Sequence, residues 1–351
     1  MKILSVSILT LLFAVSGLRA QNLYVGNDSG NDGLGTVTEY DATTGAAGFT
    51  ISSGVQIPLA LLVSGNDLYV ANNDNTVTEY NATTGVAGFT ITSGVSNPSA
   101  LLVSGSDLYV ANTGGNNGHG TVTEYNATTG VAGFTISISV YSPDSLAISG
   151  NTLYVGNLDL GVSEFNSTTG AWLSGSANNI GAGGTLEVAR GSLVVSGSNL
   201  YVANSNGYTV NEYNATTGVA GFTISGGVSD PTALAVSGSD LYVANDPGGS
   251  FPGSTVNEYN ATTGVAGFTI SGGVSDPTAL AVSGSDLYVV NVGTNAVTEY
   301  NATTGVAGFT ITSGVSNPSA LAVSPVPEPS TWAMMIAGVG SLAAFRRRRH
   351  S

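Results

Sequence analysis

The sequence has no cysteine, little histidine and little positive charge. Of its 351 residues none is cysteine, two are histidine and seven are lysine or arginine. Without cysteine the chain forms no disulfide, no thiolate metal site and no cysteine nucleophile. With only His119 and His350 available, most histidine-based catalysis and most zinc sites are excluded as well.

The few basic residues are concentrated at the two ends of the chain. Residues 21–325 carry 21 acidic side chains and one base, Arg190. A surface of this sign repels phosphate backbones and anionic lipids, which argues against nucleic acid as a partner. The abundance of Gly, Ser, Thr and Asn among β-branched apolar residues favours strands joined by tight turns.

The first 20 residues have the pattern of a secretory signal peptide. Lys2 supplies the positive charge, residues 3–15 are apolar, and Ala20 precedes a predicted cleavage before Gln21. An N-terminal anchor helix is the alternative, but the apolar run is shorter than the ~20 residues that a membrane span needs. We therefore expect a mature chain that begins at residue 21.

Residues 21–325 contain one unit repeated seven times. Each unit has four strand signals, of the types ALAVS, LYVAN, TVTEY and GFTI, separated by SGSD turns, Asn/Gly-rich loops and NATTG turns. The tyrosine of the LYV motif recurs every 40 to 47 residues, at Tyr24, Tyr69, Tyr109, Tyr154, Tyr201, Tyr242 and Tyr288. This period is typical of a four-stranded propeller blade.

The two ends of the repeat region complement each other. The region begins with a second strand, at residues 23–25, and ends with an unpaired first strand, at residues 320–324. If strand 320–324 completes the first blade, the ring closes and leaves no aggregation-prone edge. The predicted fold class is therefore all-β, a seven-bladed β-propeller of four-stranded blades, with the small-residue first strands at the axis. An open β-solenoid is the alternative that the period leaves.

The repeat pattern PSALAVSGSDLYVAN…TVTEYNATTG resembles NHL-type and YVTN-type propeller repeats over residues 22–324. Those families are mostly binding and scaffolding modules and include some enzymes. The resemblance therefore implies a fold and does not choose a function.

The last 26 residues differ from everything before them. Prolines on both sides of a glutamate disfavour helix and leave an extended segment around it. A 15-residue apolar run follows at 331–345, and this length is marginal for a membrane-spanning helix. Four arginines then hold the C-terminus on the cytoplasmic side. The extended segment around the glutamate forms a short motif of Val326, Pro327, Glu328, Pro329 and Ser330. The arginine cluster consists of Arg346, Arg347, Arg348 and Arg349.

This C-terminal arrangement resembles the PEP-CTERM sorting signal of Gram-negative bacteria. The resemblance implies export, transient inner-membrane attachment through the apolar helix, and processing by an exosortase at residues 326–330. It also implies a final location at the cell surface or in the extracellular polysaccharide of a biofilm. An uncut C-terminal anchor is the alternative.

Carboxylates at two kinds of position suggest Ca²⁺, an ion that takes 6–8 oxygen ligands. Asp28, Asp32 and Glu39 have part of the spacing of an EF-hand loop, although Gly30 replaces one ligand. Glutamate also recurs at the same position of every repeat, at Glu39, Glu79, Glu124, Glu164, Glu212, Glu258 and Glu299. For these seven we expect hydrogen bonds from hydroxyl groups of the next blade, with Ca²⁺ as the alternative. The sequence suggests no other cofactor.

The fourth repeat is irregular and holds the candidate ligand surface. Its outer strand has Trp172 where the other repeats have GFTI, and a long segment with Glu187 and Arg190 follows. An exposed tryptophan beside polar residues suits stacking on a sugar ring, whereas a decayed repeat with an inserted loop is the alternative. The Asn-Ala-Thr and Asn-Ser-Thr sequences fit glycosylation acceptors, but Asp41 occupies the same position in the first repeat, which favours a turn function.

These observations predict an exported, non-enzymatic propeller that acts as a structural or ligand-binding module at the cell surface or in the polysaccharide matrix. Near-identical blades suit a repetitive surface, whereas catalysis needs unlike groups that converge on one point. The alternative is a metal-dependent hydrolase or lactonase at the mouth of the channel.

Overall fold

The structure is a computed structural model. It describes residues 21–28, 30, 33–114, 119–158, 161–173, 180, 188–248 and 253–324, with only the backbone of residues 188–192. The predicted signal peptide, residues 1–20, and the predicted sorting signal, residues 326–351, lie outside the described residues. The part that the structure describes contains no helix with the length and apolar character of a membrane span.

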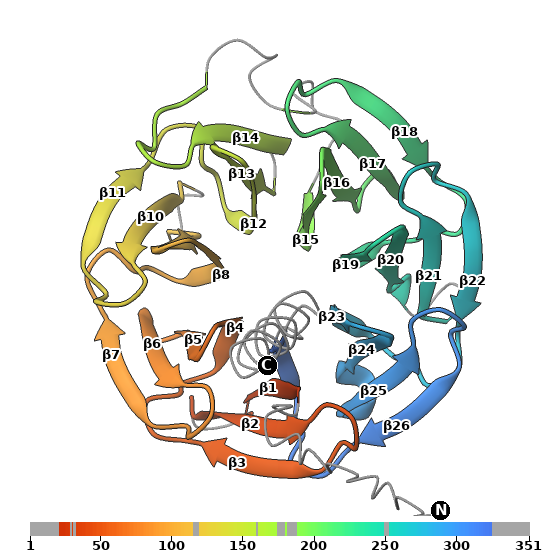
Figure 1. Cartoon of the computed structure of the whole chain (residues 1–351), viewed down its shortest axis with the longest axis horizontal. Helices are drawn as coiled ribbons and strands as arrows, with labels where there is room; N and C mark the ends of the chain where they lie inside the picture. Colours follow the sequence, from red (N-terminus) through yellow and green to blue (C-terminus); the bar gives the residue numbers. More distant parts are fainter. Residues whose placement is uncertain are drawn as a thin grey trace, which may run out of the picture.

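Seven antiparallel sheets stand around a central axis (Figure 1). Blade 1 consists of β27 (Pro318–Val323), β1 (Asn22–Asp28), β2 (Gly35–Asp41) and β3 (Ala47–Ile51). Blade 2 consists of β4 (Pro58–Ser64), β5 (Asp67–Asn72), β6 (Thr76–Asn81) and β7 (Ala87–Ile91). Blade 3 consists of β8 (Pro98–Ser104), β9 (Asp107–Asn112), β10 (Thr121–Asn126) and β11 (Ala132–Ile136). Blade 4 consists of β12 (Pro143–Ser149), β13 (Thr152–Asn157) and β14 (Gly161–Asn166).

The remaining three blades repeat the four-stranded pattern. Blade 5 consists of β15 (Val188–Ser196), β16 (Asn199–Asn204), β17 (Thr209–Asn214) and β18 (Ala220–Ile224). Blade 6 consists of β19 (Pro231–Ser237), β20 (Asp240–Asn245), β21 (Thr255–Asn260) and β22 (Ala266–Ile270). Blade 7 consists of β23 (Pro277–Ser283), β24 (Asp286–Asn291), a 3₁₀ turn η2 (Val292–Thr294), β25 (Ala296–Asn301) and β26 (Ala307–Ile311).

The C-terminal strand completes the first blade, which confirms the predicted closure. β27 pairs antiparallel with β1, with Leu23 opposite Val323 and Val25 opposite Leu321. One residue further, the Ser324 amide donates to the Asn22 carbonyl at 2.8 Å, and the Asn22 amide donates to the Ser324 hydroxyl at 2.7 Å. The first and last described strands therefore belong to one sheet, and the prediction of strand 320–324 differs only in its bounds.

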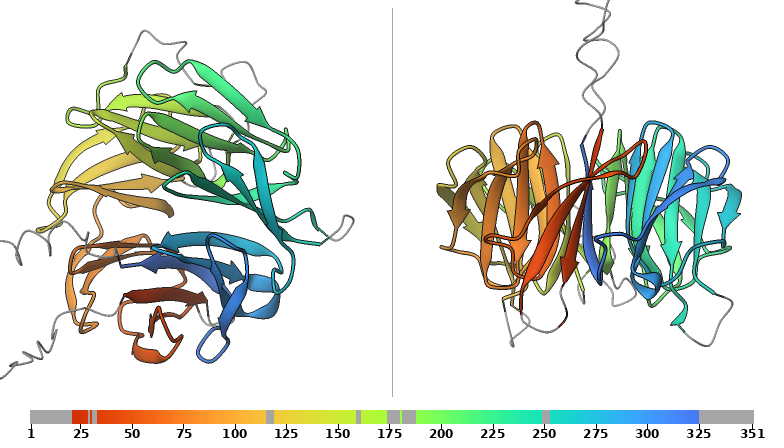
Figure 2. Two further views of the ribbon diagram at one scale, coloured as in Figure 1. Left: turned by 45° about the vertical axis from the view of Figure 1, so that its right-hand side comes forward. Right: turned by 90° about the horizontal axis from the view of Figure 1, so that it is seen from below.

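The strands run between two faces of a disc (Figure 2). One face, called the turn face here, holds the SGSD and NATTG turns, which in blade 2 are residues 64–67 and 81–85. The other, called the loop face, holds the variable second-to-third-strand loops and the connections between blades, residues 73–75 and 92–97 around blade 2. Asn22 begins β1 and Ser324 follows β27, so both ends of the described ring lie on the turn face.

The hydrophobic core lies between neighbouring blades. Tyr69, Val77 and Ile91 of blade 2 pack in one cluster with Leu108, Val110 and Tyr125 of blade 3. The second strands are covered on both sides, and Leu68, Tyr69, Val70 and Ala71 are at most 1% exposed. A sheet that is apolar on both faces needs a partner on each side, and the ring supplies one to every blade.

The tyrosine of each LYV motif hydrogen-bonds to the next blade. In that next blade, an Asn or Asp begins the NATTG-type turn. The tyrosine hydroxyl donates to the carbonyl oxygen of the residue that follows this Asn or Asp. The seven pairs are Tyr24–Ala82, Tyr69–Ala127, Tyr109–Ser167, Tyr154–Ala215, Tyr201–Ala261, Tyr242–Ala302 and Tyr288–Ala42. The Tyr288–Ala42 bond, 2.7 Å long, joins blade 7 to blade 1, so this set of bonds runs around the whole ring.

A second set of tyrosine bonds points in the opposite direction. The tyrosine of the EY motif donates to a carbonyl oxygen in the connection that leaves the previous blade, at 2.8–2.9 Å. The pairs are Tyr40–Ser313, Tyr80–Ser53, Tyr125–Ser93, Tyr259–Gly226 and Tyr300–Gly272. In blade 4 Phe165 replaces this tyrosine, so that blade lacks a hydroxyl for the same bond.

The asparagine that ends each second strand holds the incoming connection. The Asn112 side-chain oxygen accepts from the Ser96 amide at 3.0 Å, and its amide group donates to Gly94 and Thr121. Five other blades use the equivalent side chain in the same way; these are Asn27, Asn72, Asn157, Asn245 and Asn291. Because these asparagines are buried, the bonds satisfy polar groups that would otherwise be costly.

Six of the seven repeated glutamates, all except Glu164, contact a glycine in the outer strand of their own blade. The Glu79 carboxylate accepts a hydrogen bond from the Phe89 amide, at a point where the β6–β7 register shifts. It lies so close to Gly88 that an added Cβ would be 1.7 Å from Oε2. For these six glutamates the expected hydroxyl partners in the next blade are therefore wrong, because the register shift exposes a backbone amide nearer to the carboxylate.

Blade 4 departs from the predicted four strands. Val162 bridges Ile180 and Phe165 bridges Trp172, as Val77 pairs with Ile91 and Tyr80 with Ala87 in blade 2. Seven residues, 173–179, separate the two bridge partners, where blade 2 has three, 88–90. The sequence between these two bridges is thus four residues longer than in blade 2, and the bridges have the same partners on β14 as an outer strand has in the other blades.

Six of the seven inner strands have a proline near their start, the residue before that proline has a left-handed backbone, and Ile57 is the poorest fit to it. Four of the six described positions hold Asn or Asp, at φ values of 44–49°, whereas Ile57 adopts φ 43°. We predict that Ile57→Asn raises the unfolding free energy by about 1 kcal/mol, because a β-branched residue is strained there. Asn97→Ile is the matched reverse change and should destabilise; chemical denaturation measures both, and a loss of stability in Ile57→Asn would contradict the account.

A double-mutant cycle tests the Glu–Gly contact. Gly88→Ala should lower the unfolding free energy by about 1–3 kcal/mol, because it displaces a carboxylate and leaves the Phe89 amide unsatisfied. In a Glu79→Ala background the same change should cost much less, which gives a coupling above about 0.5 kcal/mol. Gly272→Ala, where an added Cβ meets nothing within 4 Å, is the control, and equal costs in both backgrounds would refute the contact.

Candidate functional site

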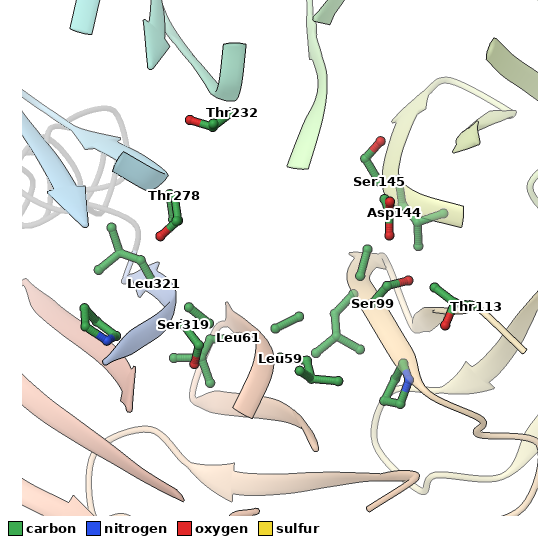
Figure 3. Close-up of a pocket in the computed structure, with 18 of the residues that line it drawn as sticks. Leu59, Leu61, Ser99, Thr113, Asp144, Ser145, Thr232, Thr278, Ser319 and Leu321 are labelled. Carbon is green, nitrogen blue, oxygen red and sulfur yellow. The ribbon is translucent and has the colours of Figure 1, made fainter. Parts of the chain in front are cut away.

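The inner strands surround a central cavity of about 830 Å³ (Figure 3). Its wall includes leucines of several blades, among them Leu59, Leu101 and Leu146. The lining also includes loop-face residues such as Asn97 and Asn317, whereas Ser104 and Ser324 at the turn-face ends of β8 and β27 are not part of it. The cavity therefore lies toward the loop face.

Hydroxyl groups on this wall bond to the neighbouring blade. The Thr232 hydroxyl donates to the Pro277 carbonyl at 2.6 Å, and the Ser319 hydroxyl donates to the Pro58 carbonyl at 2.5 Å. Ser99 bonds to the Pro143 carbonyl in the same way. These side chains line the cavity and at the same time connect adjacent inner strands.

Blade 4 places two unusual polar residues in the cavity wall, Asp144 and Ser145 (Figure 3). Asp144 is 7% exposed and is the one acidic residue in the sequences of the seven inner strands. Ser145 is 4% exposed, and its hydroxyl makes no hydrogen bond in the described part of the structure. Sequence analysis did not single out these residues, although an acid within a PxxLxxS strand was a usable signal.

The described residues of the proposed EF-hand loop do not come together. Asp28 pairs with Gly35 at the loop-face end of the β1–β2 hairpin, whereas Glu39 pairs with Tyr24, four residues along β1. At ~3.3 Å per residue the two carboxylates stand on backbone about 13 Å apart. Asp32 lies outside the described residues, and within those residues no three His, Asp or Glu side chains form a metal-sized group.

The predicted ligand surface is described only in part. Trp172 is 40% exposed at the outer strand of blade 4. Glu187 lies outside the described residues, and Arg190 is described as part of the β15 backbone only. The sorting motif, residues Val326 to Ser330, and the arginine cluster, residues Arg346 to Arg349, also lie outside them.

An exposed aromatic pair on the loop face was missed from the sequence. The rings of His119 and Tyr141 lie 4.8 Å apart between blades 3 and 4, and their backbones form an antiparallel bridge. His119 is exposed and Tyr141 is 36% exposed. The two residues are 22 positions apart in irregular segments, so no local pattern indicated that they meet.

The NATTG asparagines act as turn residues, as predicted. The Asn81 side-chain oxygen accepts from the Thr83 and Thr84 amides and from the Thr84 hydroxyl, each at 3.0 Å. Asp41 makes the same three contacts in blade 1. Burial raises the pKa of Asp41, but the bonds from Thr44 and Thr43 outweigh it and leave the pKa below its ordinary value.

Burial raises the pKa of six of the repeated glutamates, Glu39, Glu79, Glu124, Glu212, Glu258 and Glu299. A nearby aspartate raises it further in five of them, as Asp67 does for Glu79. The bond from the phenylalanine amide acts in the opposite sense without cancelling the effect. Folding therefore favours the protonated form of these carboxyl groups.

We predict that the protein becomes more stable as the pH falls from 8 to 5. A raised folded-state pKa contributes stability that is complete below the unfolded-state pKa and is lost as pH rises through the folded value. The excess negative charge of residues 21–325 acts in the same direction. Calorimetry at constant ionic strength should show a rising Tm on acidification, smaller in Glu79→Gln. A Tm that falls over this range would show that the assigned pKa directions are wrong.

Two sequence-family models match the chain. The model of the PEP-CTERM protein-sorting motif matches residues 325–349, which confirms the resemblance of the C-terminal segment. The PQQ_2 model, described as outer membrane protein assembly factor BamB, matches residues 33–265. No curated protein matches the chain.

Similar solved structures support the propeller fold. The computationally designed Ika8 protein is 18% identical, with a TM-score of 0.63, and the alignment covers 86% of this chain and 90% of Ika8. A putative 6-phosphogluconolactonase from Bacteroides fragilis is 19% identical, with a TM-score of 0.64, and the alignment covers 87% of this chain and 98% of that one. At these identities the likeness concerns the fold alone.

The seven-bladed ring fits the NHL-like repeat pattern, and the C-terminal motif marks an exported protein that is handled at the membrane. The PQQ_2 match spans more than half of the sequence, across six of the seven blades. The chain is therefore a propeller of the PQQ_2 family, the family described as outer membrane protein assembly factor BamB, with a PEP-CTERM sorting motif at its C-terminus.

Proposed function

We propose that this exported propeller is a non-enzymatic module that binds polysaccharide at the cell surface or in the extracellular matrix, after processing by an exosortase. The C-terminal helix attaches it to the inner membrane before that step. The observation that carries the proposal is that the repeated polar side chains are engaged in holding the ring together. The tyrosines, asparagines and glutamates that recur in the blades bond to backbone groups within the ring, so the repeats build a rigid platform.

The loop face offers the groups that suit a sugar polymer. His119 and Tyr141 form an exposed aromatic pair there, and Tyr208, 53% exposed, lies in the β16–β17 loop. Aromatic rings of this kind combine an apolar face with a polar tip. With 21 acids and one base in residues 21–325, the propeller repels polyanions, so a neutral or amino-sugar polymer is the preferred ligand.

A hydrolase or lactonase at the cavity mouth is the alternative, and a specific observation favours it. Asp144 is unlike the residue at the same position of every other blade, Ser145 replaces an alanine that five blades have there, and both lie in the cavity wall. The Bacteroides fragilis protein of similar fold is described as a putative 6-phosphogluconolactonase. Catalysis requires chemically different groups that meet at one point, and blade 4 supplies such groups in an otherwise repetitive ring.

One set of variants separates the two functions. Titration with neutral and amino-sugar polysaccharides should show binding that weakens roughly tenfold in Tyr141→Ala, which corresponds to about 1.4 kcal/mol. Val219→Ala, at an exposed apolar residue beside a turn-face NATTG turn, is the control and should bind as the unchanged protein does. Loss of binding in Trp172→Ala instead of Tyr141→Ala would move the binding site to the outer strand of blade 4. Turnover of lactones or glycosides that disappears in Asp144→Asn, without polysaccharide binding, would overturn the proposal in favour of an enzyme.

A further inference from the structure

The membrane attachment proposed above restricts how the propeller can be oriented. We infer that the attached ring keeps its turn face toward the membrane and presents the loop face, with the cavity and the His119–Tyr141 pair, to the outside. The inference rests on the proposed attachment through residues 331–345 and adds an orientation that the sorting motif does not specify.

The first step is the position at which the chain leaves the ring. β27 is the innermost strand of blade 1. It begins at Pro318, which lines the cavity near the loop face, and runs to Val323. Ser324 then bonds to Asn22 through two hydrogen bonds of 2.7 and 2.8 Å. The exit point is therefore fixed on the turn face, close to the axis.

The second step is the length of the connection to the apolar segment. Six residues, 325–330, separate Ser324 from the start of that segment at residue 331, which makes seven Cα–Cα steps, and three of the six are proline. Even a fully extended chain of this length spans at most ~25 Å. The folded ring must therefore stay within about this distance of the membrane surface.

The third step is the path that the opposite orientation would require. From the inner strand to the outer strand of a blade there are three interstrand spacings of ~4.8 Å, and strands of six or seven residues make the disc about 20 Å thick. A chain that passed from β27 around the rim to the loop face would need at least ~35 Å. The available ~25 Å is too short for this path. A path back through the central cavity would use about 20 Å on the thickness of the disc alone and leave almost nothing to reach the membrane, so the turn face is the face that the tether brings to it.

The charge of the turn face indicates that the covalent connection alone holds it there. Four of the SGSD-type turns end in aspartate, at Asp67, Asp107, Asp240 and Asp286. Anionic lipid headgroups repel such a face over a Debye length of about 8–10 Å. Cleavage of the tail should therefore release the ring from the membrane instead of leaving it bound to the surface.

The absence of cysteine makes the orientation directly measurable. Ser96 and Ser106 are exposed and flank the same strand, β8, on the loop face and the turn face respectively. Ser96→Cys and Ser106→Cys in the full chain, each labelled with a fluorophore and reconstituted into phosphatidylcholine vesicles with headgroup-quencher lipid, form a matched pair. We expect quenching at position 106 to exceed that at position 96 by severalfold.

A lengthened variant is the control for the tether argument. A flexible 30-residue Gly/Ser insertion after Ser324 has a typical end-to-end distance of about 30 Å and a much longer contour. In this variant the difference between the two positions should largely disappear. Specific proteolysis within the insertion should release the labelled ring from the vesicles, whereas a ring that stays bound would contradict the inference that the covalent connection alone holds it there.

The outcomes separate the orientation from the attachment. If the full chain does not float with the vesicles, the proposed attachment is wrong and the orientation fails with it. If it floats and both positions are quenched equally, or position 96 is quenched more, the attachment stands and the orientation alone is overturned.

Discussion

The structure depends on the burial of each blade against its neighbours. The second strands are apolar on both sides, and residues such as Leu108 and Val110 are fully buried only because another sheet covers each side. A blade at an open end would leave one such side in water and its strand edge unpaired. Pairing of β27 with β1 removes that cost for all seven blades at once. The repeat is therefore stable as a closed ring and not as a shorter series.

The polar residues of the repeat follow from the same constraint. Tyr69 bonds forward to blade 3 and Tyr80 bonds backward to blade 1, while Asn72 holds the connection that enters blade 2. These groups lie where sheets meet, and burial there requires hydrogen-bond partners. Function is then left to positions at which the blades differ, above all the loop face and the irregular blade 4.

Much of the fold could be predicted from the sequence because its signals are repeated. The LYV tyrosines gave the number of blades, and the unpaired strands at the two ends gave the closure. The partner of Glu79 could not be predicted in this way, because it depends on a register shift between β6 and β7. The constant spacing of nine residues from six of the seven glutamates to a glycine, as in Glu79 and Gly88, was an unused signal. The proposed Asp28–Glu39 site failed because a loop spacing was applied to what is an extended hairpin.

The contact between Asn22 and Ser324 also bears on how such a chain can vary. Because the two ends meet within hydrogen-bond distance, the ring has no structurally privileged starting point. Joining these residues by a short peptide and opening the chain in a second-to-third-strand loop would preserve the tyrosine bonds between blades. Gene duplication can likewise add or exchange a unit beginning at any strand, since circular order alone determines which surfaces meet.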